Sequence, residues 1–595
     1  MRRQLFCFLC LVVVATLQAT ADNDGFSAEQ RVAAEWLAAH SAAGTAESTE
    51  FKADALEDVI VFTARRKKAF VVVLRQTLWA FAESPVMAYS TNSYINVNSK
   101  PIQQFLQQLH LQLTARQQGG PESQPLPYLP KEEAVEPLLG DLAWGQHSPY
   151  NFLAPTMLQS QKKAIIGCVP LAIAMVMNYH KWPLQGESHV YYKPDNTTYS
   201  MDYTKCKPQW DEYRSAYSAA DTLEARNLSH LLVSIAMAVD ATFSEKATSA
   251  QMSQVKHTMC NNFRYSGKLT LRRDSLTTPV CLALLYRELD ARRPVLVTDK
   301  GHAFVCDGYN GPFLHFNFGW HSNTNGFYRM SLGNSMTNVT DTLTWLSTII
   351  YGIQPEQPLR REVVVKKAGT LSEALSTEEK ESVTKLIVKG PLNSADILLL
   401  RKMSGAPDYE TFTSWQGGSL RQLDLTDATI VNDKHPYRTE KATGSWWHVD
   451  GDTGRRTTWD FAKMTKAEWP SFKRTMGTDH EGMFYSRTDD DRYWSNYYCQ
   501  KHIVGSRMFA HCTSLHEIKL PKATREVGSY AFAGCTSLQE IRVPEKVETL
   551  GRMPFSHCTA LEKILVPSKA EMSPQGTAED CSPVLKSVTL YPVRK

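Results

Sequence analysis

The stretch IIGCVPLAIAMVMNYHKWP, residues 165–183, places one cysteine, Cys168, behind a glycine and ahead of a long apolar run. Leu171, Met175 and Tyr179 follow one another at the spacing of one helix face, so we expect a helix that begins at or beside Cys168. The whole interpretation of the sequence depends on whether this thiol is a small buried residue or the reactive group of an enzyme.

The position of the thiol at a helix start has a chemical consequence. The positive end of the helix dipole favours the thiolate, which is the nucleophilic form of cysteine. Gly167 permits a tight turn, and Pro170 fits a first helical turn because its missing N–H leaves no hydrogen bond unmade. The same pattern is more often that of a buried cysteine in an apolar helix, so a reactive role requires a base elsewhere in the chain.

That base is expected within GHAFVCDGYNGPFLHFNFGWHSNTNGFYRM, residues 301–330. His302 opens a predicted strand, an Asn-Gly-Pro turn follows, and the chain returns in a second strand that carries Asn317. Such a hairpin brings Asn317 near His302, where its amide oxygen can accept a hydrogen bond from one imidazole nitrogen while the other nitrogen faces the thiol. Trp320 is expected to shield that hydrogen bond from water.

Other histidines compete for the role of base. His180 lies closest to Cys168 in the sequence, but twelve residues of helix separate the two by about 18 Å. His315 lies on the returning strand, and His321 lies in the loop that follows it. We prefer His302 because its separation from Cys168 is that expected of papain-type Cys/His enzymes, and the alternative is a structural strand histidine.

Several stretches together carry a specific resemblance. They are AVEPLLGDLAWGQHSPYNFLAP, GCVPLAIAMVMNYHKWP, GHAFVCDGY, LHFNFGW, NGFYRM and YGIQP, in this order between Ala134 and Pro355. In them the sequence resembles the streptopain family of bacterial cysteine peptidases, whose fold is papain-like and two-lobed. The resemblance implies an α+β peptidase domain over residues 126–357 that acts on protein or peptide substrates.

The resemblance also implies the role of each site residue. Cys168 is the nucleophile and His302 the general base, while Asn317 and Trp320 occupy the family's orienting asparagine–tryptophan region. Gln146 matches the glutamine whose side-chain amide donates to the oxyanion, and the backbone N–H of Cys168 supplies the second donor. We expect no cofactor and no metal ion.

The sequence departs from the family pattern next to the expected cleft. Pro170 and Leu171 stand where Ala-Thr is usual, and Phe318 replaces the first tryptophan of N-W-G-W. His321 and Ser322 replace the glycines that usually follow the second tryptophan. Because the Cys, His, Asn and Gln positions persist, we expect the chemistry to be retained and the substrate preference to differ.

Two segments precede the peptidase region. Residues 1–21 carry two arginines, an apolar run and an Ala-Thr-Ala end, which is the pattern of a secretory signal peptide. Residues 22–125 contain a predicted strand, a basic turn and a second strand, then an amphipathic helix with Ile102, Phe105, Leu106, Leu109 and Leu113 on one face. In ESPVMAYSTNSYINVNSKPIQQFLQQL this region is similar to the family's inhibitory pro-segment; a small accessory domain that stays attached is the alternative.

The last third of the chain is periodic. Cys512, Cys535, Cys558 and Cys581 recur every 23 residues, together with a leucine and an isoleucine. This period marks a leucine-rich-repeat solenoid, and the repeats resemble those of BspA-like surface and secreted proteins. We interpret the cysteines as a ladder of small buried groups, with disulfides inside the ladder as the alternative.

These observations divide the chain into five parts. A signal peptide (1–21), an inhibitory pro-domain (22–125) and a papain-like domain (126–357) are followed by a linker (358–380) and a solenoid (381–595) with an insertion around 432–498.

Charge and hydropathy exclude some functions. A net charge of +4, from 65 basic and 61 acidic residues, gives no electrostatic sign of nucleic-acid binding. No segment after the signal is long enough for a transmembrane helix, so we expect an exported protein that is secreted or attached to the cell surface and does not span the membrane.

Two functions fit this organisation. The first is a secreted cysteine endopeptidase made as a zymogen, whose repeats bind or target. The alternative is a surface binding or adhesion protein, in which the repeats hold a host protein, a glycan or another cell and the peptidase unit is inactive. The intact Cys/His/Asn/Gln set weighs against inactivity, and acyl transfer to an amine is a third possibility for the same set.

Overall fold

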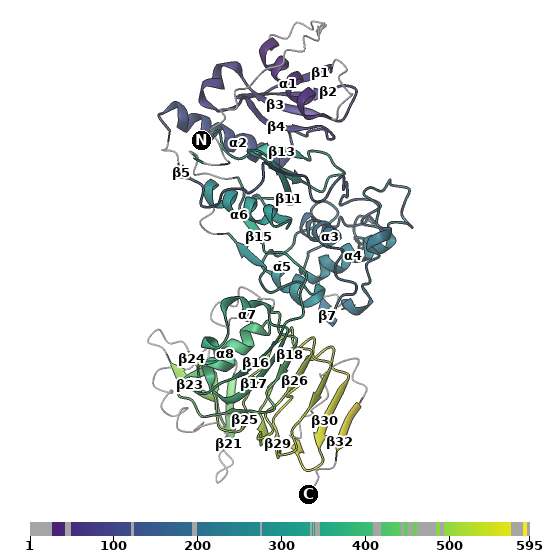
Figure 1. Cartoon of the computed structure of the whole chain (residues 1–595). Coiled ribbons are helices and arrows are strands. Elements are labelled where there is room, and N and C mark those ends of the chain that lie inside the picture. Colours follow the sequence, from purple (N-terminus) through teal and green to yellow (C-terminus); the bar gives the residue numbers. More distant parts are fainter. Residues whose placement is uncertain are drawn as a thin grey trace.

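A computed structural model gives the fold. It describes residues 26–41, 49–120, 124–187, 189–192, 199–273, 277–333, 336, 338–339, 345–407, 418–441, 445–449, 456–460, 483–487, 493–572 and 587–591, so the expected signal peptide lies outside the described residues. An N-terminal unit (residues 26–120), a central unit (124–356) and a repeat region (357–591) follow one another along an elongated molecule (Figure 1).

The N-terminal unit is an antiparallel sheet with a helix on each face. Its elements are α1 (Ser27–His40), β1 (Phe51–Ala55), β2 (Val59–Ala64), β3 (Phe70–Leu74), β4 (Val86–Ser90) and α2 (Lys100–Gln117). Residues Ile60 and Phe62 face α1, while Val59 and Val61 face α2, as the alternation of a strand requires. The predicted strand pair and amphipathic helix are confirmed as β2, β3 and α2.

Strand β4 joins the N-terminal sheet to the central unit. It pairs antiparallel with β13 (Gly326–Arg329), through Tyr89 opposite Phe327 and Ala88 opposite Tyr328. The ring of Tyr89 stacks on that of Phe327, with the centroids 5.0 Å apart. One sheet therefore runs through both units. After β1-β2-β3-β4-β13 its order continues with β12 (Phe313–Asn317), β11 (Ala303–Asn310), β10 (Val295–Thr298), β15 (Thr348–Tyr351) and β9 (Thr270–Arg272).

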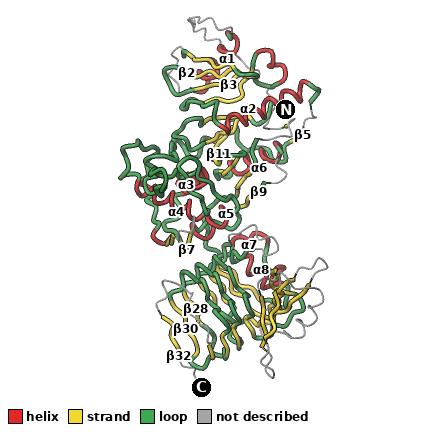
Figure 2. The backbone as a smooth tube through the Cα atoms, turned by 180° about the vertical axis from the view of Figure 1, so that it is seen from behind, coloured by secondary structure: helices red, strands yellow, loops and turns green. Residues whose placement is uncertain are grey.

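The central unit has two lobes. One is helical, with α3 (Cys168–His180), α4 (Arg226–Ala238) and α5 (Gln254–His257) gathered on one side (Figure 2). The other contains α6 (Thr278–Asp290) and the strands β9 (Thr270–Arg272), β10 (Val295–Thr298), β11 (Ala303–Asn310), β12 (Phe313–Asn317) and β15 (Thr348–Tyr351). Helix α3 packs against α4 on one side and against β10 and β11 on the other. The expected two-lobed α+β architecture is confirmed.

Parallel ladders build the repeat region. Strands β26 (Glu517–Lys519), β28 (Glu540–Arg542) and β30 (Lys563–Pro567) align Ile518, Ile541 and Ile564 in register, and β32 (Ser587–Tyr591) follows. A second ladder consists of β25 (Ile503–Val504), β27 (Glu526–Val527), β29 (Thr549–Leu550) and β31 (Glu571–Met572). The solenoid predicted from the 23-residue period is confirmed.

The cysteines of the ladder are buried and unbridged. Cys512, Cys535 and Cys558 are free thiols, and Cys581 lies outside the described residues. The Sγ atoms of Cys535 and Cys558 each lie 3.1 Å from a backbone oxygen of the preceding coil. For these three residues the interpretation as small buried groups is confirmed.

The boundary of the solenoid differs from the expectation. Residues 358–380 were expected to form a linker, but they contain β16 (Arg360–Val364), which pairs in parallel with β17 (Lys385–Leu392). The apolar residues of β16 are too few to be recognised by periodicity, and the partner strand is what makes it part of the sheet. The expected insertion contains strands β20 (Pro436–Lys441) to β24 (Tyr493–Tyr498), none of which joins the parallel ladders in the described residues.

Buried charges fix the repeat region to the central unit. Arg421 donates from Nε to Glu356 at 2.9 Å, and their side chains are only 8% and 3% exposed. His516 Nε2 lies 2.7 Å from a carboxylate oxygen of Glu187. A charge that stays buried after its partner is removed costs several kcal/mol, so each side chain of this pair depends on the other while the junction is closed. None of the described helices combines the length and apolar character needed to cross a membrane.

The cost of breaking this junction can be measured. Arg421→Ala leaves the Glu356 carboxylate buried without its partner, which should destabilise the full chain by about 3–5 kcal/mol. Lys522→Ala breaks the exposed pair with Asp427 (2.7 Å) and should cost less than about 1 kcal/mol. Calorimetric unfolding of both variants checks this, and similar small shifts in both would contradict a buried junction.

Candidate active site

Helix α3 begins at Cys168, as the sequence predicts. The preceding residue, Gly167, has φ +93°, and a Cβ there would lie 3.0 Å from the backbone oxygen of Thr248. The Thr248 hydroxyl donates to Ile165 O at 2.7 Å, so the loop around Thr248 supports the turn that leads into the helix. Gly167 is therefore required both by its backbone conformation and by the close approach of this loop.

The thiol of Cys168 meets the beginning of β11. Cys168 is half-buried, and burial raises the pKa of its thiol. The backbone N–H groups of Ala303, Cys168 and Val169 oppose this rise by donating to the sulfur. Because Ala303 directly follows His302, the structure brings the start of α3 to the start of the strand on which the base was predicted.

His302 is buried within aromatic rings. Its imidazole stacks on Trp320 with the centroids 4.4 Å apart, and His302 Nε2 donates to Phe318 O at 2.8 Å. Burial lowers the pKa of His302 to about 4, although the bond to Phe318 opposes the shift. The imidazole is therefore neutral at neutral pH. Trp320 covers one face of the ring, but the Asn317–His302 hydrogen bond that it was expected to shield is not formed.

Asn317 makes different contacts from those expected. Its Nδ2 donates to Leu142 O at 2.8 Å, and its Oδ1 accepts from the N–H of Gly319 at 3.1 Å. The chain turns at Gly319 (φ +71°), and the carbonyl that reaches His302 is that of Phe318. The expected hydrogen bond between Asn317 and His302 is thus replaced by a backbone contact, and the amide of Asn317 holds the segment around Leu142.

Gln146 lies beside the approach to Cys168. Its backbone oxygen accepts from Ile166 N at 3.1 Å, and its side chain is half-buried. The preceding Gly145 is covered by His321, since a Cβ at Gly145 would lie 2.2 Å from His321 Nε2. Four segments therefore meet around Cys168 and His302, namely 142–146, 165–168, 299–303 and 317–321.

The two competing histidines are placed differently. His315 Nδ1 lies 2.6 Å from Asp307, and both side chains are buried within the sheet. His321 is exposed, and its ring lies 5.4 Å from that of Tyr150. Neither lies on the strand start that Cys168 meets, which supports the preference for His302.

Asp299 is a site residue that the sequence analysis missed. Its Oδ1 accepts from the N–H groups of Gly301 and His302, both at 2.6 Å. Burial raises the pKa of this carboxyl, and the side chain of Lys100 is the cation that opposes the rise. The sequence did contain a signal for this turn, because Asp299 precedes His302 by three residues and a glycine lies between them. Aspartate side chains at such positions often accept hydrogen bonds from the backbone N–H groups of a turn.

The N-terminal unit covers the loops that carry His302 and Trp320. Thr324 N donates to Tyr94 O at 2.6 Å, and Lys300 N donates to Gln104 Oε1 at 3.2 Å. Lys100 packs against Gly301, where a Cβ would lie 2.4 Å from its Nζ. Residues 93–104 thus contact the His302 turn at Lys300 and Gly301, and the loop after Trp320 at Thr324.

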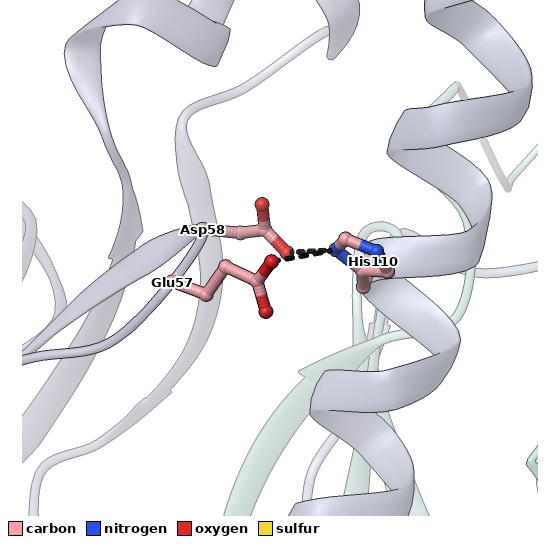
Figure 3. Close-up of side chains that lie close together, drawn as sticks. All are labelled: Glu57, Asp58 and His110. Carbon is pink, nitrogen blue, oxygen red and sulfur yellow. Dashed lines mark hydrogen bonds and ion pairs between the residues drawn. The ribbon is translucent and has the colours of Figure 1, made fainter.

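One group in the described part of the chain has side chains suited to a metal ion. Glu57, Asp58 and His110 point toward one another from the β1–β2 turn and from α2 (Figure 3). His110 Nδ1 lies 2.9 Å from Asp58 and 3.9 Å from Glu57, and the bond with Asp58 raises the pKa of His110. An ion pair between α2 and the turn accounts for this arrangement, which lies within the N-terminal unit.

Comparison with known proteins agrees with the sequence motifs. Residues 144–328 match the model of the Peptidase C10 family, and residues 501–592 match that of the BspA type leucine-rich repeat region in six copies. The chain is 29% identical over 214 residues to the thiol protease/hemagglutinin PrtT of Porphyromonas gingivalis, covering 34% of this chain and 24% of that protein. It is 26% identical over 230 residues to streptopain of Streptococcus pyogenes, covering 34% of this chain and 58% of streptopain.

The chain therefore spans less than two thirds of the length of either curated relative. Among solved structures, a fragment of prointerpain A from Prevotella intermedia is similar at 20% identity and a TM-score of 0.43, over 52% of this chain and 100% of the fragment.

The role of Asp299 can be tested without an activity assay. Asp299→Ala leaves the buried N–H of His302 and the N–H of the exposed Gly301 without their acceptor, which should destabilise the chain by about 1–3 kcal/mol. The amides of Gly301 and His302 should then exchange with deuterium faster. Asp299→Asn keeps an acceptor oxygen and should lose less, and Asp211→Ala, at an exposed position, serves as the control. Unchanged exchange in Asp299→Ala would contradict the capped turn.

Proposed function

On the premise that the chain carries a peptidase domain of the C10, or streptopain, family and a BspA-type leucine-rich repeat region, we propose that it is an exported cysteine endopeptidase made as a zymogen. The observation that supports this most is the meeting of the Cys168 thiol, at the start of α3, with the first residue of β11, which follows His302. The repeats are the part that binds or targets.

The proposed reaction proceeds through an acyl-enzyme. The thiolate of Cys168 attacks a peptide carbonyl carbon, and the negative oxygen is held by the Gln146 side-chain amide and the Cys168 N–H. His302 as imidazolium donates its proton to the leaving amine, and as imidazole it then takes a proton from the water that releases the acyl group. Trp320 keeps water from the outer face of the imidazole, and Asn317 positions the segment that leads to Gln146.

In the described state both groups of the pair are uncharged. Burial raises the pKa of Cys168 and lowers that of His302, so both groups are neutral at neutral pH. A neutral thiol is a poor nucleophile, and the imidazole is bonded to a backbone oxygen. Residues 93–104 lie over the His302 turn in this state. Removing the N-terminal unit would readmit water and free the loops, which favours the thiolate–imidazolium form.

Labelling of Cys168 tests the proposed nucleophile. Of the nine cysteines in the described residues, only Cys168 is not buried, so an epoxide thiol inhibitor should modify it alone. We expect slow labelling of the intact chain, fast labelling after the N-terminal unit is released, and none in Cys168→Ala, as measured by mass spectrometry of the tryptic peptides. Equal labelling of the released wild type and Cys168→Ala would refute the assignment.

The oxyanion role of Gln146 predicts a kinetic signature. Gln146→Ala should lower kcat on a peptide substrate by about 10²–10³ while KM changes little, because the lost hydrogen bond forms mainly in the transition state. The exposed Gln159→Ala is the matched control. A rise in KM with unchanged kcat would show that Gln146 binds the substrate and does not stabilise the oxyanion.

The repeat region has a binding function of its own, next to the activity of the peptidase domain. The repeat region is fixed to the helical lobe by the buried pair of Arg421 and Glu356, so whatever it holds is carried at a constant distance from α3. A protein whose released form is not labelled at Cys168 but still binds through its repeats would favour the adhesion function alone.

A further inference from the structure

We infer that His321, together with His147, selects the substrate residue on the leaving-amine side of the cleaved bond and favours an acidic side chain there. The inference rests on the proposed function and names a preference of the same site. It starts from the loop after Trp320, where His321 and Ser322 replace the glycines that are usual in the streptopain family. The proposed mechanism gives neither residue a role.

The position of His302 identifies the leaving-amine side. In the proposed reaction His302 gives its proton to the leaving nitrogen, so the departing residues must lie on the same side of Cys168 as the imidazole. Trp320 stacks on that imidazole with the centroids 4.4 Å apart, and His321 is the next residue in the chain. The loop that begins at His321 therefore borders the leaving-amine side.

The imidazole of His321 lies on the segment that carries the proposed oxyanion donor. Its ring occupies the space that a side chain at Gly145 would need, since a Cβ there would lie 2.2 Å from Nε2 and 2.5 Å from Cε1. The backbone fixes this position, because His321 N donates to Trp144 O at 3.1 Å. Gln146 directly follows Gly145, so the ring of His321 reaches the immediate neighbour of the oxyanion donor.

The backbone of this loop would suit glycine better than the residues it has. His321 and Ser322 have φ values of +53° and +65°, in the left-handed region that glycine adopts without strain. Side chains held in such a conformation are often found where they contact a ligand. The replacement of glycine at this position therefore points to a role for the imidazole itself.

His147 brings a second imidazole to the same place. Burial lowers the pKa of His321, and the charge of the nearby His147 lowers it further. Both residues are exposed, and neither imidazole has a hydrogen-bond partner in the part of the chain that the structure describes. A carboxylate beside them would relieve the repulsion between two imidazolium ions and accept their N–H groups.

The other titratable side chains that face His321 are phenols. The ring of Tyr150 lies 5.4 Å from that of His321, and burial is the main cause that raises the pKa of Tyr150 to about 12. Tyr94 belongs to the segment of the N-terminal unit that contacts this loop. Asp221 acts on the Tyr150 hydroxyl and is itself paired with Arg214 at 3.7 Å. Both imidazoles therefore remain available to a carboxylate of the substrate.

The loop after Trp320 also offers backbone and hydroxyl groups to a chain that passes along it. In the described structure that chain belongs to the N-terminal unit. Thr324 N donates to Tyr94 O at 2.6 Å, Asn96 N donates to Thr324 Oγ1 at 3.3 Å, and the hydroxyl of Ser93 donates to Ser322 O. The leaving residues of a substrate would meet the same groups once the N-terminal unit is released.

A pair of peptides tests this preference. They are built on a sequence that the matured enzyme hydrolyses, and they differ only in glutamate or glutamine directly after the cleaved bond. The ratio of kcat/KM for the two peptides cancels the ionisation of Cys168 and His302, which affects both peptides alike. We expect the ratio to rise about three- to tenfold from about pH 8 to about pH 5.5, because His321 gains its charge only as the pH falls toward its lowered pKa.

Three variants assign the effect. His321→Asn tolerates a positive φ and removes the titratable charge, so the ratio should lose most of its pH dependence. His147→Asn should lose part of it, and the exposed His435→Gln of the repeat region is the matched control, with the ratio of the wild type.

A wild-type ratio that does not change with pH, or a His321→Asn enzyme that keeps the full rise, overturns the inference, while hydrolysis of the glutamine peptide upholds the proposed function. Failure of the wild type to hydrolyse any peptide or to be labelled at Cys168 would refute the proposed function itself.

Discussion

The pairing of β4 with β13 is the constraint on which the other contacts of the N-terminal unit depend. Two residue pairs and the stacked rings of Tyr89 and Phe327 add the N-terminal strands to the central sheet. Once this register is fixed, the chain leaving β4 passes over Thr324 and enters α2 beside Gly301. Strand pairing buries apolar side chains and satisfies backbone groups at once, so a register shift would lose both.

Burial also sets the electrostatics at Cys168 and His302. For both groups burial outweighs the hydrogen bonds that oppose it, which leaves a neutral thiol and a neutral imidazole. The helix dipole and three N–H donors at Cys168 are in place to stabilise a thiolate, but the low dielectric disfavours any unpaired charge. The N–H donors for a thiolate are therefore in place while the thiol itself stays neutral.

The two outer units are attached to the central unit in different ways. The N-terminal unit is held by strand pairing and apolar contacts, and a long linker connects it. The repeat region is joined to the helical lobe by charged pairs. One of them, Arg421 with Glu356, is buried from water. In Figure 1 the N-terminal unit and the repeat region lie on opposite sides of the central unit.

Local patterns in the sequence determined several helices, strands and repeats of this protein. Four features depend on residues that lie close together in the chain, so the spacing of apolar residues alone identifies their buried face. They are the helix start at Cys168, the hairpin after His302, the amphipathic α2 and the 23-residue ladder. The separation of the chain into an N-terminal unit, a central unit and a repeat region follows from the same patterns.

Only the tertiary structure decided which atoms meet. Asn317 could bond to His302 or to Leu142, and the turn at Gly319 selects the second. The capping role of Asp299 depends on a loop conformation, and the strand at 360–364 exists because β17 lies beside it. In each case competing partners of similar strength were available, and packing against residues far away in the sequence chose between them.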